Sequence, residues 1–347
     1  MLPTKVLALL IWIILVNIMS ADNKFGKIII TGFNGTSSAN AQVQKIKQHI
    51  DNYSIGGIIL YQRNIINQSQ LKSLINYLTQ DTPAIITIDH EGGYVNRLVD
   101  PSFELQTPSA ESFCKLPIHM QKKIANKTAK KLKELGITVN FGGVADIKPY
   151  IQPSSVCQSN RCFSDNTEKI VDCLNQHLIA HDNHNLVYTI KHFPGISFTP
   201  IDSHHSLPDI TKSHSPINYM PYHTLNQTRF LKMVMVGHSL NKNIDPNYPS
   251  SLSKKTIDYL KTIIGFDGII ITDDLKMGAL INSDKPLIDR SIQAVNAGNH
   301  LLLFESLPTK TIHAINKKIT HTYHSNPMFA QHIKTSIKKY HSIIGHH

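Results

Sequence analysis

The chain alternates between short apolar runs and helix-compatible stretches, and this alternation is the feature that most limits how it can fold. Eight of the runs are rich in β-branched residues and have the length and pattern of buried strands. They are Lys27–Thr31, Gly57–Tyr61, Ala84–Ile88, Thr138–Phe141, Leu186–Lys191, Lys232–Gly237, Gly268–Thr272 and His300–Phe304. Helices are expected over Gln68–Gln80, Met120–Leu135, Thr167–His181, Lys254–Ile264 and Ile288–Ala297, with residues 309–344 following the last strand.

Strict alternation of this kind implies parallel strands joined by crossover helices, which is the α/β class. Eight such units fit a (β/α)8 TIM barrel, and the 347-residue chain suits one large domain. A doubly wound open sheet is the runner-up, but it usually has a glycine-rich phosphate turn after its first strand. Gly32-Phe-Asn-Gly35 matches that turn poorly. We therefore predict a single-domain barrel.

Three of the apolar runs end abruptly in ionisable side chains. Asp273 and Asp274 follow the seventh run, Asp89 follows the third, and Lys191 with His192 ends the fifth. A single aspartate in such a place is often only the N-cap of the next helix. Barrel active sites, however, lie at the C-terminal ends of the strands, so three strands ending in this way predict a shared site.

The first residues have the pattern of a secretory signal peptide. A short basic start is followed by the apolar run Val6–Ile18 and then by small residues. We expect residues 1–21 to be removed and residues 22–347 to form the barrel domain, in an exported protein of the periplasm or the extracellular space. The alternative is an uncleaved membrane anchor. No later stretch is long and apolar enough to be a second span.

The composition favours anionic partners but not nucleic acid. Lys and Arg number 35 against 24 Asp and Glu, a net charge of +11, which suits partners such as cell-wall fragments. The charges are nevertheless dispersed, as in the lysines of Met120–Leu135, where a solvated helix face is the better interpretation. No basic patch interleaved with aromatic residues is present, so we expect no nucleic acid partner. The oligomeric state is not predicted.

Four cysteines are present, and an exported chain meets an oxidising compartment in which they can pair. They are Cys114, Cys157, Cys162 and Cys173. Cys157 and Cys162 are nearest in sequence, but spacing alone leaves the pairing open. No CxxC pair occurs, so we expect no zinc site, and we predict no cofactor.

Three sequence blocks resemble the signatures of family 3 glycoside hydrolases, and more narrowly the single-domain β-N-acetylhexosaminidases of the NagZ type. The blocks are Asp89-His-Glu-Gly-Gly-Tyr-Val-Asn-Arg97-Leu, then Lys191-His-Phe-Pro-Gly195 followed by Asp202-Ser-His204, and finally Gly265-Phe-Asp-Gly268 leading to Thr272-Asp273-Asp274-Leu275. Weaker matches include Gly56 to Asn64, Val144-Ala-Asp146, Arg161-Cys-Phe163 and Ala297-Gly298. The resemblance runs in order from about Gly26 to Phe304 and implies a (β/α)8 barrel.

The resemblance also implies a retaining hydrolysis with Asp273 as nucleophile and His204 as acid/base catalyst, oriented by Asp202. A carboxylate with an ordinary pKa of about 3.9 is ionised at neutral pH, as a nucleophile must be. An imidazole with an ordinary pKa of about 6.5 can exchange a proton near neutral pH, and an aspartate on its other nitrogen fixes the tautomer. For Asp274 the preferred role is capping.

Sugar binding is assigned by the same resemblance to Asp89, Arg97, Arg161, Lys191 and His192. Carboxylates accept hydrogen bonds from hydroxyls, and Lys and Arg donate them. The plainer alternatives are surface ion pairs for the two arginines and a packed strand-end role for His192. Glu91 is expected to build the site rather than to donate a proton.

Two departures from the family pattern are visible. The family commonly continues Phe-Pro-Gly with His-Gly, whereas this chain has Ile196 and Ser197, which affects the loop that carries His204. A family aspartate after Ala-Gly-x is replaced by His300 at a position that we expect to be peripheral.

The function implied is a retaining exo-β-N-acetylglucosaminidase that removes terminal N-acetylglucosamine from glycans, with peptidoglycan fragments as the expected substrates. Three alternatives stay open. A histidine donor would let phosphate approach the glycosyl-enzyme, which would give a phosphorylase. His181 and His184 have the helical spacing of a metal-dependent hydrolase. The last alternative is a non-catalytic glycan-binding protein.

Overall fold

The computed structural model describes residues 24–150, 154–281 and 285–345. The predicted signal peptide, residues 1–21, lies outside this part of the chain, and so does the boundary at residue 22. None of the helices in the described ranges is both long enough and apolar enough to cross a bilayer.

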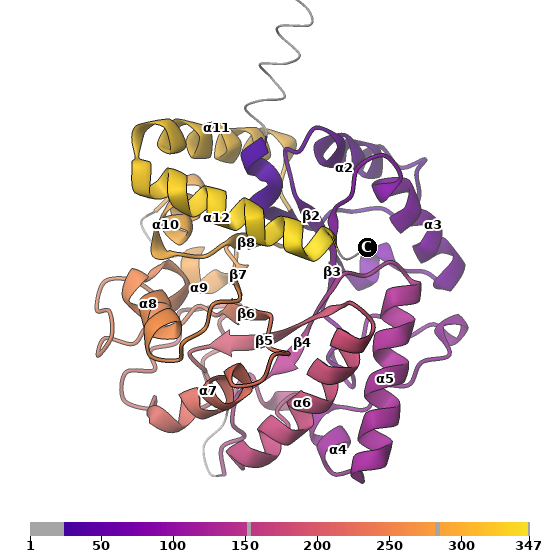
Figure 1. Ribbon diagram of the computed structural model, residues 1–347, viewed down its shortest axis with the longest axis vertical. Coiled ribbons are helices and arrows are strands. Elements are labelled where there is room, and N and C mark those ends of the chain that lie inside the picture. The colour runs from indigo at the N-terminus through magenta and orange to yellow at the C-terminus, as the bar shows by residue number, and fades with distance from the viewer. Residues whose placement is uncertain (1–23, 151–153, 282–284, 346–347) are drawn as a thin grey trace, which may run out of the picture.

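Eight parallel strands close into a barrel in chain order, with helices on the outside (Figure 1). The strands are β1 (Ile29–Thr31), β2 (Gly57–Leu60), β3 (Ile85–Ile88), β4 (Val139–Val144), β5 (Val187–Phe193), β6 (Met233–Val236), β7 (Ile269–Asp274) and β8 (Leu301–Phe304). Ile30 of β1 lies opposite both Gly57 of β2 and Leu303 of β8, so the first and last strands pair. This closure confirms the (β/α)8 TIM barrel and excludes the open sheet.

Several strands extend beyond the predicted limits at their C-terminal ends. β4 continues to Val144, β5 continues to Phe193, and β7 includes Asp273 and Asp274. The apolar pattern ends earlier, because the extension of β4 contains two glycines and those of β5 and β7 include His192, Asp273 and Asp274. At the other end of the chain, β1 is shorter than predicted because Lys24–Ile28 forms a 3-10 helix, η1.

The helices form the outer layer and bury one face each. They are α2 (Ala41–Asp51), α3 (Gln68–Thr79), α4 (Ala110–Cys114), α5 (Ile118–Glu134), α6 (Thr167–Asn183), α7 (Met220–Asn226), α8 (Lys254–Thr262), α9 (Gly278–Ile281), α10 (Leu287–Ala297), α11 (Thr309–Ser325) and α12 (Pro327–Ile344). On α5, Ala125, Ala129 and Leu132 are buried while Lys123 and Lys127 are exposed, as the solvated-face interpretation predicts.

Four of these helices are absent from the sequence prediction. α4, α7 and α9 are too short for a clear helical period, whereas α2 spans 11 residues and repeats Val43, Ile46 and Ile50 on its buried face. Residues 309–344 form two helices, because Asn326 caps the second and Pro327 is its first residue.

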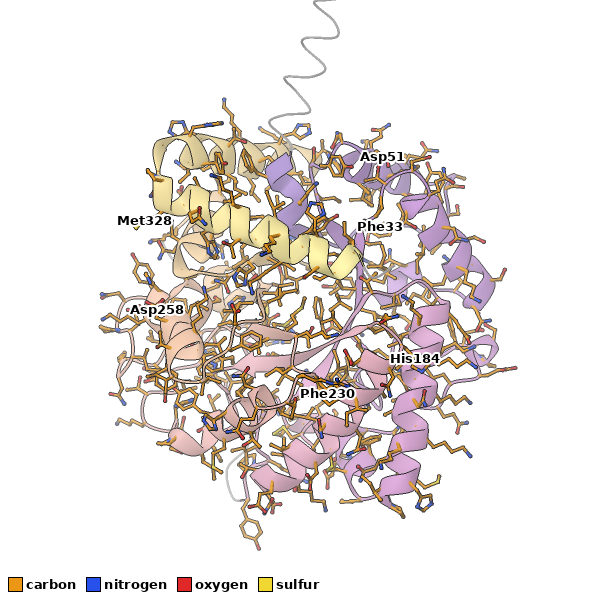
Figure 2. The ribbon with its side chains drawn as sticks, in the orientation of Figure 1. Phe33, Asp51, His184, Phe230, Asp258 and Met328 are labelled. Atoms are coloured by element: carbon orange, nitrogen blue, oxygen red, sulfur yellow. A yellow bond between two sulfur atoms is a disulfide. The ribbon has the colours of Figure 1, made fainter. Side chains whose placement is uncertain are left out.

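The barrel interior is a packed core closed at its N-terminal end by α12. Side chains occupy the space between the ribbons, with Asp258 and Met328 at the periphery (Figure 2). Lys339 Nζ donates to the carbonyl of Gly268 just before β7 (3.0 Å), and the Tyr340 hydroxyl donates to the carbonyl of Pro83 before β3 (3.2 Å). The opposite end of the barrel is therefore the end at which a site can open.

Both cysteine pairs form disulfides. Cys114 on α4 is bonded to Cys173 on α6, and Cys157 is bonded to Cys162 between β4 and α6. The first bridge joins two outer helices across 59 residues, and the second closes a separation of only five.

Candidate active site

All eight predicted site residues line a single cavity of about 360 Å³ at the C-terminal ends of the strands. They are Asp89, Arg97, Arg161, Lys191, His192, Asp202, His204 and Asp273. Residues from β3, β5 and β7 contribute to the cavity, as the three charged strand ends predict.

A buried charge network lies at the base of the cavity. The ammonium of Lys191 contacts Asp89 Oδ1 at 2.9 Å and Glu91 Oε1 at 2.8 Å, and its side chain is only 4% exposed. Lys191 is thus held as a cation between two carboxylates, because an unpaired buried charge would be strongly unfavourable. The pairing fixes the orientation of Asp89 toward the cavity.

Glu91 is a structural anion of this network. Its carboxylate receives two hydrogen bonds of 2.8 Å from Arg161, through Nε and Nη2, in the bidentate geometry that suits a guanidinium. Burial favours the neutral acid, but the charges of Lys191 and Arg161 prevail and lower the pKa of Glu91 to about 2. Glu91 therefore carries no proton to donate near neutral pH, in agreement with its predicted role. Arg161 is a cavity residue rather than a surface ion pair.

Asp273 is an ionised carboxylate at the end of β7. Burial by itself would raise its pKa, but the electrostatic influence of His192 and His238 and the backbone N–H of Asp274 lower it on balance. That N–H donates to Asp273 Oδ1 at 2.8 Å. One carboxylate oxygen is therefore oriented by the backbone, and the group is held in the charged form that a nucleophile needs.

Asp274 has a different environment. Its Oδ1 accepts hydrogen bonds from the backbone N–H groups of Lys276 (2.9 Å) and Glu305 (3.0 Å), so it ties the turn after β7 to the end of β8. Burial, with the nearby charge of Asp273, raises its pKa to about 6 despite these bonds. Asp274 therefore stabilises the turn after β7 and does not cap helix α9, which begins at Gly278.

Asp202 and His204 form a hydrogen-bonded pair on the loop between β5 and α7. His204 Nδ1 lies 2.7 Å from Asp202 Oδ1, which also accepts the backbone N–H of His204 at 2.9 Å. The His204 side chain is 66% exposed. Burial alone would raise the pKa of Asp202, but the hydrogen bonds from His204 lower it. Since Nδ1 is engaged, Nε2 is the nitrogen available for proton transfer.

Asp146 is a site residue to which the sequence analysis assigned no role. Its side chain is fully buried at the end of β4, and Oδ2 lies 3.1 Å from His192 Nδ1. Its other oxygen accepts the backbone N–H of Ile196 (2.6 Å) and the hydroxyl of Ser197 (3.3 Å). Asp146 therefore fixes both the ring of His192 and the start of the loop that carries His204.

Arg97 lines the cavity, and its side chain contains one donor without a partner among the described residues. Its Nε is buried and has no hydrogen-bond partner within the described ranges, and its guanidinium lies 5.8 Å from the ring centroid of Tyr61. A buried donor without a partner is costly unless a ligand satisfies it. Tyr61 and Glu305 also line the cavity, and the sequence analysis gave neither of them a role.

The two histidines that suggested a metal site have separate hydrogen-bond partners. His181 is buried, with Nδ1 2.8 Å from the carbonyl of His177, whereas His184 caps the end of α6 and contacts Asn126 Oδ1 at 2.6 Å. Across residues 24–150, 154–281 and 285–345, no group of three or more His, Cys, Asp or Glu side chains has an arrangement suited to a metal ion.

Comparison with known protein families gives a match to the glycosyl hydrolase family 3 N-terminal domain over residues 20–339. The chain belongs to glycosyl hydrolase family 3. This membership confirms the resemblance drawn from the three sequence blocks, and it accords with a glycoside hydrolase rather than a binding protein.

Curated relatives of this family 3 chain carry the name β-hexosaminidase. That of Haemophilus ducreyi is 28% identical over 326 residues, which make up 90% of each chain. That of Psychromonas ingrahamii is 30% identical over 76% of this chain and 83% of its own length. β-Hexosaminidase A of Pseudoalteromonas piscicida is 28% identical over 75% of this chain, which spans only 47% of that protein.

Solved structures with the same fold include family 3 enzymes. A β-N-acetylglucosaminidase from Paenibacillus sp. superposes with a TM-score of 0.84 at 25% identity, covering 94% of this chain and 62% of its own. A β-N-acetylhexosaminidase from Beutenbergia cavernae gives a TM-score of 0.82 at 20% identity, covering 93% and 98% of the two chains. The second likeness concerns the fold alone.

Proposed function

We propose that this family 3 chain is a retaining exo-β-N-acetylglucosaminidase that works through a covalent glycosyl-Asp273 intermediate. The observation that carries the proposal is that the ionised Asp273 and the Asp202–His204 pair line the same cavity. A retaining enzyme needs a carboxylate nucleophile and a proton donor on opposite sides of the scissile bond. The names of the relatives support N-acetylhexosamine as the sugar.

In the first step, a carboxylate oxygen of Asp273 bonds to the anomeric carbon as the glycosidic C–O bond breaks. His204, protonated at Nε2, gives its proton to the departing oxygen, and the electron pair of the broken bond stays with that oxygen. Asp202 stabilises the imidazolium and holds the ring through Nδ1. The products of this step are the free aglycone, neutral His204 and a glycosyl ester of Asp273.

In the second step, water attacks the anomeric carbon and displaces Asp273. Neutral His204 accepts a proton from that water at Nε2, which restores the imidazolium. The second displacement restores the original configuration at the anomeric carbon. Both steps use only water and side chains of this chain.

The charged network at the base of the cavity is suited to the hydroxyl groups of the non-reducing sugar. Asp89 offers acceptor oxygens, and Lys191 and Arg161 present donors held in place by Glu91. Arg97 also lines the cavity, and its guanidinium supplies further donors. His192 is oriented by Asp146 and faces the same space.

The substrates we propose are peptidoglycan fragments met outside the cytoplasm. The net charge of +11 favours anionic glycans, and the apolar segment Val6–Ile18 supports export with cleavage of the signal peptide. Intact-mass measurement on protein from its native host tests the export proposal. Retention of residues 1–20 would contradict it.

The test of activity compares a chromogenic N-acetylglucosaminide with the matching glucoside, in phosphate and in an inert buffer. We expect the N-acetyl substrate to be preferred and free N-acetylglucosamine to be the product in both buffers. Formation of a sugar 1-phosphate would instead establish the phosphorylase alternative. Trapping with a fluorinated N-acetylglucosaminyl fluoride should place the label on Asp273, and a label on Asp89 or Glu91 would overturn the mechanism.

A further inference from the structure

A short disulfide-closed segment lies against the loop that carries His204. We call residues 154–162 the disulfide segment and residues 196–204 the acid/base loop. Cys157 and Cys162 are bonded with 4.9 Å between their Cα atoms. Cys157 is partly exposed and Cys162 is buried, and neither sulfur belongs to a residue lining the cavity in the described part of the chain.

Ser155 connects the two segments by hydrogen bonds. Its backbone N–H donates to the carbonyl of Thr199 at 3.1 Å, and its hydroxyl donates to the carbonyl of Ile201 at 3.0 Å. Ile201 immediately precedes Asp202. The disulfide segment is therefore bonded to the acid/base loop one residue before the catalytic pair begins.

Apolar contacts join the same two segments. Val156, Cys162 and Ile196 form a small cluster with Val144 of β4, separate from the main core, and Cys157 packs against it. Ile196 is therefore an apolar contact between the acid/base loop and the disulfide segment.

The backbone of the disulfide segment is held in a conformation that it would not adopt freely. Ser159 and Asn160 are both left-handed, with φ of 56° and 59°, and neither is glycine. Such conformations are unfavourable for residues with a Cβ and persist where the surroundings impose them. Here they lie between the two bonded cysteines, directly before Arg161. The disulfide closes the turn that contains both residues.

We propose that the Cys157–Cys162 disulfide is a positioning element for catalysis, which keeps Ser155 and Val156 in place against the acid/base loop and so holds His204 over the cavity. Cys157 and Cys162 act through Ser155, Val156 and Ile196, and they touch no reacting atom. The inference rests on the proposed function, in which His204 is the proton donor. Without the bridge, the turn relaxes and His204 loses its fixed distance to the leaving oxygen.

The test compares Cys157→Ser/Cys162→Ser with Cys114→Ser/Cys173→Ser, a matched control that removes the other disulfide. We expect kcat of the first variant to fall by about tenfold or more on N-acetylglucosaminides with alkyl aglycones, which need protonation. On activated aryl glycosides, which leave without a proton, the change should be less than about twofold. The control variant should show no such difference between substrates.

Removal of the Cys157–Cys162 disulfide in a His204→Ala variant tests whether the loss of kcat depends on His204. If the disulfide acts through His204, its removal in that background should cause no further loss on alkyl glycosides. Equal losses on alkyl and aryl substrates, or a rise in KM alone, would mean that the bridge acts on sugar binding through Arg161, and the inference would be wrong.

Hydrogen exchange tests the same inference without a measurement of enzyme activity. Amides of residues 196–204 should exchange about tenfold faster or more in Cys157→Ser/Cys162→Ser than in the wild type and the control. Unchanged protection would overturn the inference. If the wild type cleaves no N-acetylglucosaminide, the proposed function fails, and the exchange rates alone then decide whether the disulfide holds the loop.

Discussion

Asp273 and Glu91 are two carboxylates of one cavity, and their neighbours give them different tasks. Glu91 is bonded to a guanidinium and an ammonium, so its oxygens are occupied and its charge is neutralised. Asp273 has one backbone donor and more distant histidines, so an oxygen stays available to attack. Two carboxylates thus have different environments, which suit a structural anion at Glu91 and the proposed nucleophile at Asp273.

We predict that Asp273→Ala lowers kcat by at least about 10⁴-fold while the protein stays folded, because no other group is placed to form the glycosyl ester. Steady-state kinetics and the melting temperature are the measurements. Asp274→Asn is the matched control, since it alters the adjacent carboxylate but not the nucleophile. Activity within about tenfold of wild type for Asp273→Ala would refute the assignment.

We predict that His204→Ala slows substrates with poor leaving groups by about 10²- to 10³-fold and activated phenyl glycosides by less than about tenfold. Good leaving groups depart without a proton, so only the substrates with poor leaving groups need the imidazole. A series of aryl glycosides with graded leaving-group acidity measures this difference. A uniform loss across the series would mean that His204 only positions the substrate.

The Asp202→Asn variant tests the other half of the pair. The amide keeps a partner near Nδ1 but removes the negative charge that favours the protonated ring. The basic limb of the pH–rate profile should therefore move to lower pH, with a smaller loss of kcat than for His204→Ala. An unshifted profile would show that Asp202 acts by geometry alone.

The proposed catalytic residues could be placed in the cavity from the sequence because each stands within a short local motif at a strand end or in the loop that follows it. Asp146 could not be assigned in this way. Its partner His192 is 46 residues away, and the contact exists only because β4 and β5 are neighbours in the barrel. His300, which was expected to be peripheral to the site, does not line the cavity in the described part of the chain. It is buried, and its Nδ1 accepts the backbone N–H of Ile270 at 2.9 Å.

At the scale of elements, the two disulfides constrain different lengths of chain. Cys114–Cys173 closes 59 residues and ties α4 to α6, whereas Cys157–Cys162 closes only five. In the chain-entropy model, a disulfide that closes a longer loop adds more to the free energy of unfolding. The contribution is about 4 kcal/mol for the first bridge and about 2 kcal/mol for the second. The Cys157–Cys162 bridge, which lies nearer the cavity, thus contributes less to the free energy of unfolding.

We therefore predict that Cys114→Ser/Cys173→Ser lowers the free energy of unfolding more than Cys157→Ser/Cys162→Ser does, by about 2 kcal/mol. Urea denaturation under non-reducing conditions measures both variants against the wild type. A larger loss for the Cys157 and Cys162 variant would contradict the entropic argument. It would show that the turn over residues 157–162 supports the fold as well as the site.

Element types were predicted more securely than element ends. The eight strands follow from apolar runs covered on both faces, which is what a parallel barrel requires. α2 was missed although its buried face has the helical period, because long polar side chains surround it. The ends of β5 and β7 were placed too early, since β5 continues through His192 and Phe193, and β7 continues through Asp273 and Asp274.

At the scale of the whole molecule, several histidines of the described residues have pKa values lowered by burial, and the largest shifts that affect fully buried or nearly fully buried rings concern His90, His177, His181 and His300. Burial is the main cause that lowers the pKa of His90 to about 4, of His177 and His181 to about 3, and of His300 to about 2. His177 and His181 pack with Tyr188, at centroid distances of 5.2 and 4.5 Å. Protonating any of them would place a charge in the interior of the protein.

These histidines make stability depend on pH in a definite direction. Their pKa values in the folded state lie below the unfolded value of about 6.5, so the unfolded chain binds more protons below pH 6.5. Stability therefore falls as the pH drops from about 6.5 toward 4, by up to about 2 kcal/mol per histidine at pH 5. Asp274 has the opposite effect on stability. Its pKa is raised to about 6, so its protonation favours the folded state as the pH falls through this range.

We predict that the urea midpoint is lower at pH 5.0 than at pH 7.5, because four histidines outweigh one carboxylate. His177→Gln should reduce the difference between the two midpoints, since it removes one of the groups that must be neutral in the fold. Asp274→Asn should enlarge the difference by removing the opposing group. A wild-type midpoint at pH 5.0 equal to or above that at pH 7.5 would mean that the buried histidines are not neutral in the folded protein.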